Sequence, residues 1–309
     1  LLKSGLPSNH PSLVRAGEWM LEKEVKSFGD WSMKNPVREP SGWYFQHANE
    51  FYPDNDDAAV VMMSLQLLDL PDKDRKSQAI LRGFKWLIGM QCNDGGWGSF
   101  DKNNNKKILN NIPFADWNAL LDPSTSDLTA RVLDLMGKLG YDLSFSPAKK
   151  AVDFLKKEQE KNGSWFGRWG TNYVYGTWSV LTGLYSIKED MNKDYVKKSA
   201  SWLIDFQNED GGWGETCKSY WDTSFSAIGR STASQTSWAV LGLLCTEERY
   251  SDAVKKGIEY LINTQKEDGT WDEDEFTGTG FPKIFYLRYH MYRSYFPLLA
   301  LSKFRNMIE

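Results

Sequence analysis

Apolar residues recur along this chain at the spacing of amphipathic helices, and the predicted helices come in pairs. In one copy, Ala200, Leu203 and Ile204 fall on a single helical stripe. A Gly-rich turn, such as residues 93–96, ends the first helix of each pair. Second helices are expected at 57–70, 128–139, 177–186, 235–244 and 294–304. No sustained alternation of apolar and polar residues calls for a β-sheet.

A repeated motif marks these pairs. An aromatic residue is followed by Gln and then by a Trp that lies 11 positions after the aromatic. The four copies are Trp86–Gln91–Trp97, Phe154–Gln159–Trp165, Trp202–Gln207–Trp213 and Tyr260–Gln265–Trp271, with a weaker copy at Trp19–Glu24–Trp31. We interpret the motif as structural: the Gln bonds backbone at a helix end, and the Trp covers the next pair. Stacked pairs of this kind predict an all-α toroid, an α/α barrel, with residues 1–309 as its single domain.

Composition narrows the functional classes. A hydrophobic content of 41% supports a large core, and a net charge of −4 gives no electrostatic case for nucleic-acid binding. Three cysteines without metal-type spacing and three histidines do not indicate a metal site. The aromatic content of 14% is compatible with large cores, sugar-binding surfaces, cation stabilisation or an aromatic-walled cavity.

The segment with the most pointed chemistry contains Asp54, Asp56 and Asp57, immediately before an apolar helix. Such a cluster is often a solvated helix cap, and calcium binding is a second alternative that lacks the usual spacing here. Aromatic residues precede the cluster, however, and an uncharged Ala-Ala-Val-Val run follows it. Carboxyl groups crowded in an apolar pocket cannot all ionise, so one is expected to keep its proton near neutral pH and to donate it to a weak base.

With the repeats and this cluster together, the chain resembles the squalene-hopene cyclase family. The repeats match the Gln-Trp motifs of that family, and residues 54–57 match its Asp-x-Asp-Asp protonation motif. Segments 163–170, 234–236 and 278–282 extend the resemblance along the chain. It implies a class II polyprene cyclase that converts squalene or a related long isoprenoid to a polycyclic terpene such as hopene, with no cofactor and no metal.

The resemblance also assigns roles to individual positions. Asp56 would be the proton donor, and Asp54 and Asp57 would share its hydrogen bonds and charge. Cavity-lining residues would be Phe45, Phe100, Phe114, Trp169, Phe281, Phe285 and Leu287, the aromatic ones stabilising carbocations. Supporting positions would be Trp31, Arg131, Tyr175, Tyr289 and Tyr292. Without the resemblance, ordinary core packing would be the simpler explanation for each aromatic residue.

Two positions depart from the squalene cyclases of the family. Arg131 stands where those enzymes have a His; it can pair with a carboxylate but cannot relay a proton as His can. Phe100 stands where they have a Tyr, which keeps the ring and loses the hydroxyl. Both changes point to a modified substrate or product, and a sesquarterpene cyclase acting on a partly cyclised polyprene is the alternative.

The resemblance further implies partners and a location. Family members are about twice as long, so we expect a fragment of a two-barrel enzyme that lacks its amino-terminal barrel. Segment 111–117, with Phe114, matches the region near the substrate entrance. We expect peripheral, one-sided attachment of the whole enzyme to the cytoplasmic side of a membrane, and a homodimer stays open.

Two other enzyme classes are alternatives to the cyclase. A protein prenyltransferase β-subunit shares a helix toroid but needs zinc ligands, for which Cys217 and His290 are candidates. A glycosidase would use Asp54 and Asp56 as acid and base, yet residues two apart in one turn are poorly placed across a sugar. The acid motif and the repeats favour the cyclase over both.

Overall fold

The structure, a computed structural model, describes residues 1–106 and 120–309. Ten α-helices lie in the described part: α1 Pro11–Glu22, α2 Asn55–Leu67, α3 Lys73–Gly89, α4 Ser126–Lys138, α5 Ser146–Glu158, α6 Tyr173–Ser186, α7 Asp194–Asp205, α8 Ala233–Leu243, α9 Asp252–Asn263 and α10 Tyr292–Ile308. Short 3-10 helices are η1 Leu2–Ser4, η2 Asp30–Met33, η5 Cys217–Tyr220, η6 Thr223–Phe225 and η7 Glu247–Tyr250. Two strands, β1 Gly278–Phe281 and β2 Phe285–Leu287, form the sheet.

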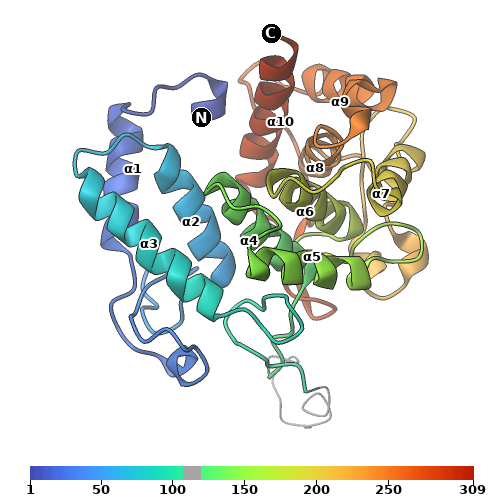
Figure 1. Cartoon of the computed structure of the whole chain (residues 1–309). Helices are drawn as coiled ribbons and strands as arrows, with labels where there is room; N and C mark the ends of the chain where they lie inside the picture. The colour runs from blue at the N-terminus through green and yellow to red at the C-terminus, as the bar shows by residue number, and fades with distance from the viewer. Residues whose placement is uncertain (107–119) are drawn as a thin grey trace.

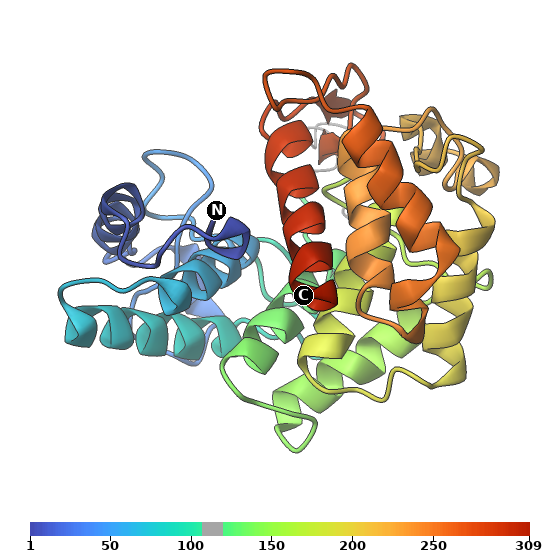
Figure 2. The same ribbon diagram turned by 90° about the horizontal axis from the view of Figure 1, so that it is seen from above.

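The even-numbered helices form an inner layer and the odd-numbered helices an outer one. Along the inner layer α2 packs on α4, α4 on α6, α6 on α8 and α8 on α10, while α3, α5 and α9 cover the neighbouring inner helices (Figure 1). Helices α6 and α8 are buried along most or all of their length, whereas α7 and α9 bury one face. Seen from above, α1–α3 lie to one side of the group formed by α4–α10 (Figure 2). The predicted all-α toroid of helix pairs is confirmed.

The motif glutamines bond backbone at helix ends, as predicted. The amide of Gln159 donates to the carbonyl oxygen of Gly163, 2.8 Å away, and to that of Tyr195 at the start of the next outer helix, also 2.8 Å away. Gln91 and Gln207 make the same two bonds in their repeats. Each of these glutamines therefore closes its own turn and joins it to the following helix pair.

The motif tryptophans lock each turn onto its repeat. The indole N–H of each donates to a backbone carbonyl ten residues earlier in the outer helix, with distances of 2.7–2.8 Å for Trp97, Trp165, Trp213 and Trp271. Trp213 also reaches the next outer helix, where a side chain at Gly257 would clash with its ring. At the turn itself Gly95 has φ +99°, a left-handed conformation that glycine adopts without strain.

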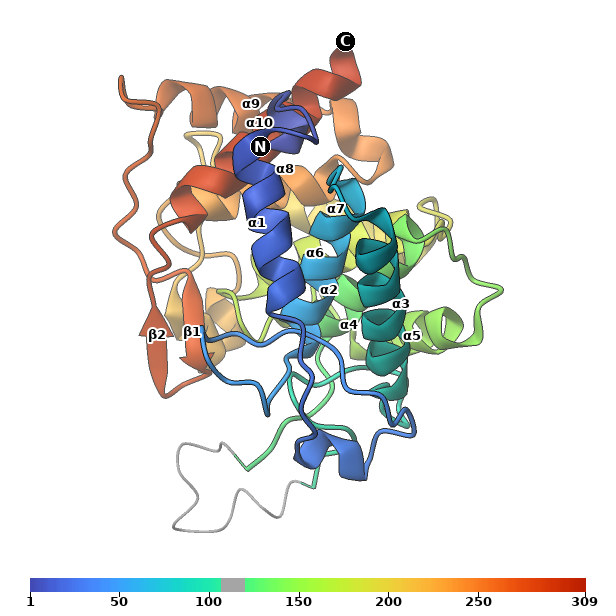
Figure 3. The same cartoon turned by 90° about the vertical axis from the view of Figure 1, so that its left-hand side faces the viewer.

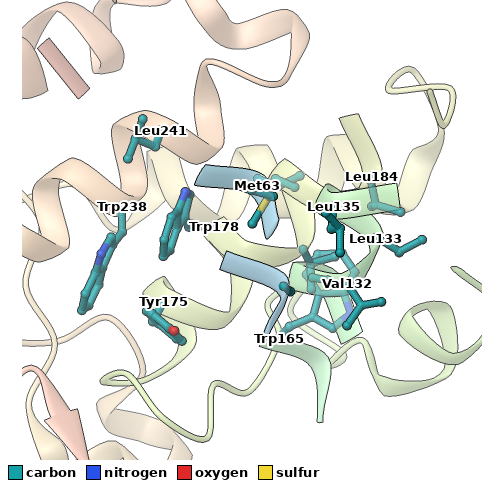
Figure 4. Close-up of a cluster of buried hydrophobic side chains, with 14 of the residues drawn as sticks. Met63, Val132, Leu133, Leu135, Trp165, Tyr175, Trp178, Leu184, Trp238 and Leu241 are labelled. Carbon is teal, nitrogen blue, oxygen red and sulfur yellow. The ribbon is translucent and has the colours of Figure 1, made fainter. Parts of the chain in front are cut away.

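The core takes its side chains from the inner helices, from the facing sides of the outer helices and from the motif tryptophans. Figure 4 shows part of this cluster, in which Trp178 of α6 lies beside Trp238 of α8. Trp165, Trp238 and Leu133 are fully buried. Within the described ranges, no helix is both long and apolar enough to cross a membrane.

The hairpin of β1 and β2 was not expected from the sequence. Its strands have four and three residues, too few for a visible alternation of apolar and polar positions. Gly278 pairs with Leu287, and Phe281 with Phe285. Figure 3 shows the two strands side by side at the edge of the molecule. The hairpin matters because three of the predicted cavity residues, Phe281, Phe285 and Leu287, lie on it.

Candidate active site

The acidic motif forms the amino-terminal end of inner helix α2. Asp54 is the cap: one of its carboxylate oxygens accepts hydrogen bonds from the backbone N–H groups of Asp56, at 2.6 Å, and Asp57, at 3.2 Å. Asn55 is fully buried and donates its side-chain amide to the carbonyl oxygen of Gly98, 2.9 Å away. The motif is therefore held rigidly, with the positive end of the helix dipole directed at its carboxyl groups.

Asp56 faces Arg131, which inner helix α4 places opposite it. Oδ1 of Asp56 lies 3.1 Å from Nε of Arg131, and the Asp56 side chain is 30% exposed. The same guanidinium donates a hydrogen bond from Nη2 to the hydroxyl of Tyr175 on α6, 3.1 Å away. Its central carbon lies 5.3 Å from the ring centroid of Trp178, also on α6. Three adjacent inner helices thus meet at one ion pair.

The three carboxyl groups have raised pKa values. Burial raises the pKa of Asp54 well above its usual range, and the charges of Asp57 and Asp56 add to this. Burial also raises the pKa of Asp56, with Arg131 acting in the opposite direction. The pKa of Asp57 rises to about 7 through burial and the neighbouring charge of Asp56. The cluster therefore retains protons near neutral pH, as the crowding of acids in the sequence predicts.

Arg131 remains a cation despite its burial. Burial by itself would lower its pKa, but Asp56, Tyr175 and Asp134 raise it above the usual arginine range. Asp134 lies one turn further along α4 and accepts hydrogen bonds from Lys138, at 2.6 Å, and from a serine of α6. The charges along this part of α4 alternate in sign, so each stabilises its neighbours.

An aromatic cluster surrounds this ion pair. The ring of Tyr175 lies 5.0 Å from that of Trp238, which lies 5.9 Å from Tyr292, and Tyr292 lies 4.7 Å from Tyr289. The structure thus brings together three of the predicted supporting residues. It adds Trp178, Trp238, Tyr295 and Phe296, which the sequence analysis did not single out. Trp178 and Tyr295 follow predicted residues by three positions on a helix, which places them on the same face and could have identified them.

A second group gathers Trp169, Phe281 and Phe285. The ring centroids of Trp169 and Phe281 are 6.4 Å apart, and those of Phe281 and Phe285 are 5.9 Å apart. Backbone bonding between the hairpin and the Trp169 segment fixes this arrangement. Asp127 at the start of α4 also holds that segment, because one oxygen of its buried carboxylate accepts from the N–H groups of Arg168, at 2.9 Å, and Trp169, at 3.0 Å. Sequence reasoning missed Asp127 as a positioning residue.

Three other predicted residues, Trp31, Phe45 and Phe100, do not join these groups. Trp31 is buried edge-on against Trp86 of outer helix α3, 6.0 Å between centroids, where it occupies the Trp position of the weak first motif. Trp31 therefore belongs to the core of its own repeat. Its position in the motif directs its ring toward the outer helices. Phe45 is 64% exposed and Phe100 is 36% exposed, so no wall is built around them by the described residues. Phe114 lies outside the described residues. Cavity roles for these phenylalanines stay predictions.

The residues weighed for a zinc site do not form one. Cys217 contacts the hydroxyl of Thr171 and the carbonyl oxygen of Phe276. His290 instead lines a polar cavity of about 70 Å³ together with Glu273, Asp274, Arg288, Tyr289 and Arg293. Within residues 1–106 and 120–309, no three His, Cys, Asp or Glu side chains are grouped to hold a metal ion. The cavity is also far smaller than the roughly 300 Å³ at which ligand pockets begin.

Comparisons with known proteins show what this chain is similar to. The family described as the squalene-hopene cyclase C-terminal domain matches residues 1–306. A squalene–hopene cyclase of Zymomonas mobilis is 48% identical over 313 residues, which cover 99% of this chain and 47% of that protein. A dammaradiene synthase of Dryopteris crassirhizoma is 45% identical over 332 residues, which cover 100% of this chain and 48% of that protein. The chain spans about half the length of the curated relatives it matches.

Among solved structures, the type II terpene cyclase MstE from Scytonema has a similar fold. The two chains match with a TM-score of 0.67 at 15% identity, over 99% of this chain and 86% of that chain. At this level of identity the likeness concerns the arrangement of the helices and does not extend to substrate.

Proposed function

This chain belongs to the squalene-hopene cyclase family, as its carboxyl-terminal domain, and we propose that it supplies the acid of a class II polyprene cyclase. Such an enzyme protonates a carbon–carbon double bond of a long isoprenoid, and the resulting cation closes rings. The observation that carries the proposal is the carboxyl cluster at the start of α2, in which burial raises the pKa values and Asp56 lies beside Arg131.

The chemistry follows from the groups at the site. The O–H of Asp56 donates its proton to an alkene carbon, a C–H bond forms, and the carboxyl group becomes a carboxylate. Arg131, 3.1 Å away, and the helix dipole stabilise that carboxylate. Ring closure moves the positive charge along the substrate, where the faces of Trp169, Phe281 and Phe285 stabilise it. Loss of a proton to water, or addition of water, ends the reaction.

A second barrel is needed to enclose the substrate. The polar cavity beside Tyr289 cannot hold a long isoprenoid, and Phe45 is left exposed. The curated relatives have about twice the length of this chain. We therefore place the remaining wall of the cavity in an amino-terminal barrel, and we place the whole enzyme peripherally on the cytoplasmic side of a membrane, where an isoprenoid substrate dissolves.

Product analysis tests the function. The chain is assayed alone and as a completed enzyme, joined to the amino-terminal half of the Zymomonas mobilis relative. Each is incubated with squalene or with a monocyclic polyprene, and the products are identified by mass spectrometry. We expect cyclic products from the completed enzyme and negligible turnover from the chain alone. If the completed enzyme is folded but forms no cyclic product from either substrate, the proposal is contradicted.

The same assay resolves the substrate. Arg131 replaces the His of the family's squalene cyclases, and Phe100 replaces a Tyr, so we expect the substrate cavity to differ from theirs. These differences favour a partly cyclised polyprene as a second candidate. Faster turnover of the monocyclic polyprene than of squalene would assign the chain to the sesquarterpene cyclases.

A further inference from the structure

The Arg131 guanidinium makes three different contacts at the site. Nε lies 3.1 Å from Oδ1 of Asp56, Nη2 donates to the Tyr175 hydroxyl at 3.1 Å, and the central carbon lies over the ring of Trp178 at 5.3 Å. The Trp178 side chain is buried, so its ring acts on the cation with little water between them. A desolvated cation on a tryptophan face is the strongest form of this interaction.

The ion pair does not set its own geometry. Although Nε of Arg131 and Oδ1 of Asp56 are 3.1 Å apart, the two atoms lack the alignment of a hydrogen bond. A charge pair without a directional bond depends on how its members are held from other sides. Asp56 is held by the turn at the start of α2, whereas Arg131 is held by Tyr175 and by the face of Trp178.

Trp178 is itself fixed by aromatic packing. Its ring stacks on Trp238 with centroids 6.0 Å apart and an interplanar angle of 8°, and Phe296 meets it edge-on at 5.3 Å. Tyr175 packs against it from the same helix, 5.5 Å away. Figure 4 shows Trp178 beside Trp238, with Tyr175 nearby. The ring therefore offers Arg131 a rigid platform.

We propose that Trp178 is a positioning residue, whose ring face holds the Arg131 guanidinium against Asp56 and so controls how readily Asp56 releases its proton. The contact between Trp178 and Arg131 stands on geometry alone, while its effect on turnover rests on the proposed cyclase function. Trp178 needs no contact with substrate for this role.

The expected pH signature follows from the titratable groups that face Asp56. These groups are Asp54 and Asp57 of α2, Arg131 and Asp127 of α4, Tyr175 of α6, and Tyr292 and Tyr295 of α10. Arg131 is the cation among them and lowers the pKa of Asp56. Moving Arg131 away raises that pKa, which makes Asp56 a weaker acid that keeps its proton to higher pH. Turnover should therefore fall at its maximum while its alkaline limb moves to higher pH.

Turnover in the completed enzyme gives the first test. Trp178→Leu should lower the maximal rate by up to about 30-fold, the worth of a desolvated cation–π contact, and move the alkaline limb to higher pH. Trp178→Phe keeps a smaller ring and should show a weaker shift in the same direction, which guards against a variant that fails to fold. Trp202→Leu is the matched control, since Trp202 of outer helix α7 is similarly buried but packs on Phe206, the residue that follows that helix.

The Arg131→Met background identifies the route of the effect. If Trp178 acts through Arg131, Trp178→Leu should leave the pH profile of the Arg131→Met enzyme unchanged. The proposal would be overturned if Trp178→Leu lowered the rate without shifting the alkaline limb. It would also be overturned if the shift were equal in the wild-type and Arg131→Met backgrounds, or if Trp202→Leu produced the same shift.

A readout without activity separates this proposal from the cyclase function. Unfolding equilibria of the 309-residue chain are measured in urea for wild type, Trp178→Leu, Arg131→Met and the double variant. We expect the two changes to be coupled: the double variant should lower the folding equilibrium constant by up to about 30-fold less than the product of the two single effects. If the two substitutions change the unfolding equilibrium independently, Trp178 does not interact with Arg131, even if the enzyme is active. If they are coupled but the completed enzyme is inactive, the contact exists and the catalytic role of Trp178 is refuted.

Discussion

Asp56→Asn is the change that most directly tests the site. The amide fills the volume of the carboxyl group but has no acidic proton, so the first step of cyclisation loses its donor. Positioned general acids commonly contribute about 10²–10⁴ in rate, and protonation of an alkene by water offers no comparable route. We expect turnover of Asp56→Asn to fall by at least about 10⁴. Asp54→Asn and Asp57→Asn should also be severe, because these neighbours set the protonation and orientation of Asp56.

The fold should tolerate the same change. At 3.1 Å, Asp56 and Arg131 attract each other by about 5 kcal/mol at an effective dielectric constant near 20. Burial opposes this attraction and prevails, since the pKa of Asp56 lies above its ordinary value. A neutral amide avoids that burial cost, and Arg131 keeps its contacts with Tyr175 and Trp178. We therefore expect a stability change within about 2 kcal/mol, as for an ordinary point substitution.

The assay is product formation by the completed enzyme at matched concentrations of folded protein. Arg131→Ala serves as a companion variant, and it should be damaging because Arg131 faces Asp56. Circular dichroism and urea unfolding establish that each variant is folded. Turnover of Asp56→Asn at the wild-type rate would refute the assignment of the acid, whatever the products of the enzyme.

Three further predictions concern the frame and the charge of the site. Gln159→Ala removes two backbone hydrogen bonds and should lower the free energy of unfolding by about 1–3 kcal/mol, measured in urea. Gly95→Ala should destabilise more than Gly140→Ala, because both have positive φ but only a side chain at Gly95 meets a backbone oxygen, 2.4 Å away. Asp57→Asn should stabilise the chain by roughly 4 kcal/mol above pH 7 and not below pH ~4, since the pKa of Asp57 rises by about 3 on folding. In the folded state Asp57 keeps its proton up to a pKa of about 7, whereas in the unfolded chain it loses that proton near pH ~4. The stability of the wild-type chain therefore falls as the pH rises between these two values. A gain from Asp57→Asn that is equal above pH 7 and below pH ~4 would contradict this linkage.

The frame could be predicted because its signals are local. A Gln, a left-handed Gly and a Trp recur at fixed spacing, and their main hydrogen bonds span four to ten residues. The acid motif could be predicted for the same reason, since the Asp54 cap bonds to residues two and three positions later. Where one turn of chain determines a contact, residue types and spacing are enough.

The rest of the site depends on contacts between distant segments. Trp178 meets Arg131, and Asp127 bonds the Trp169 segment, only because α4 and α6 pack at a particular rotation. The hairpin is similar: its strands are too short to show a pattern, and backbone bonds to the Trp169 segment place it. No spacing in the sequence encodes these rotations, although the three-residue step from Tyr175 to Trp178 puts both on one face.

The acid of such an enzyme must meet two opposed demands, and the structure divides them among different groups. It must keep its proton in water near neutral pH, and burial together with the charge of Asp127 raises the pKa of Asp56 accordingly. It must also release that proton to an alkene, a very weak base, and Arg131 favours the carboxylate that remains. A histidine could serve the second demand only while protonated, whereas an arginine is charged at every working pH. Its effect therefore depends on position alone, which is why the residues that seat the guanidinium, Tyr175 and Trp178, matter as much as the charge itself.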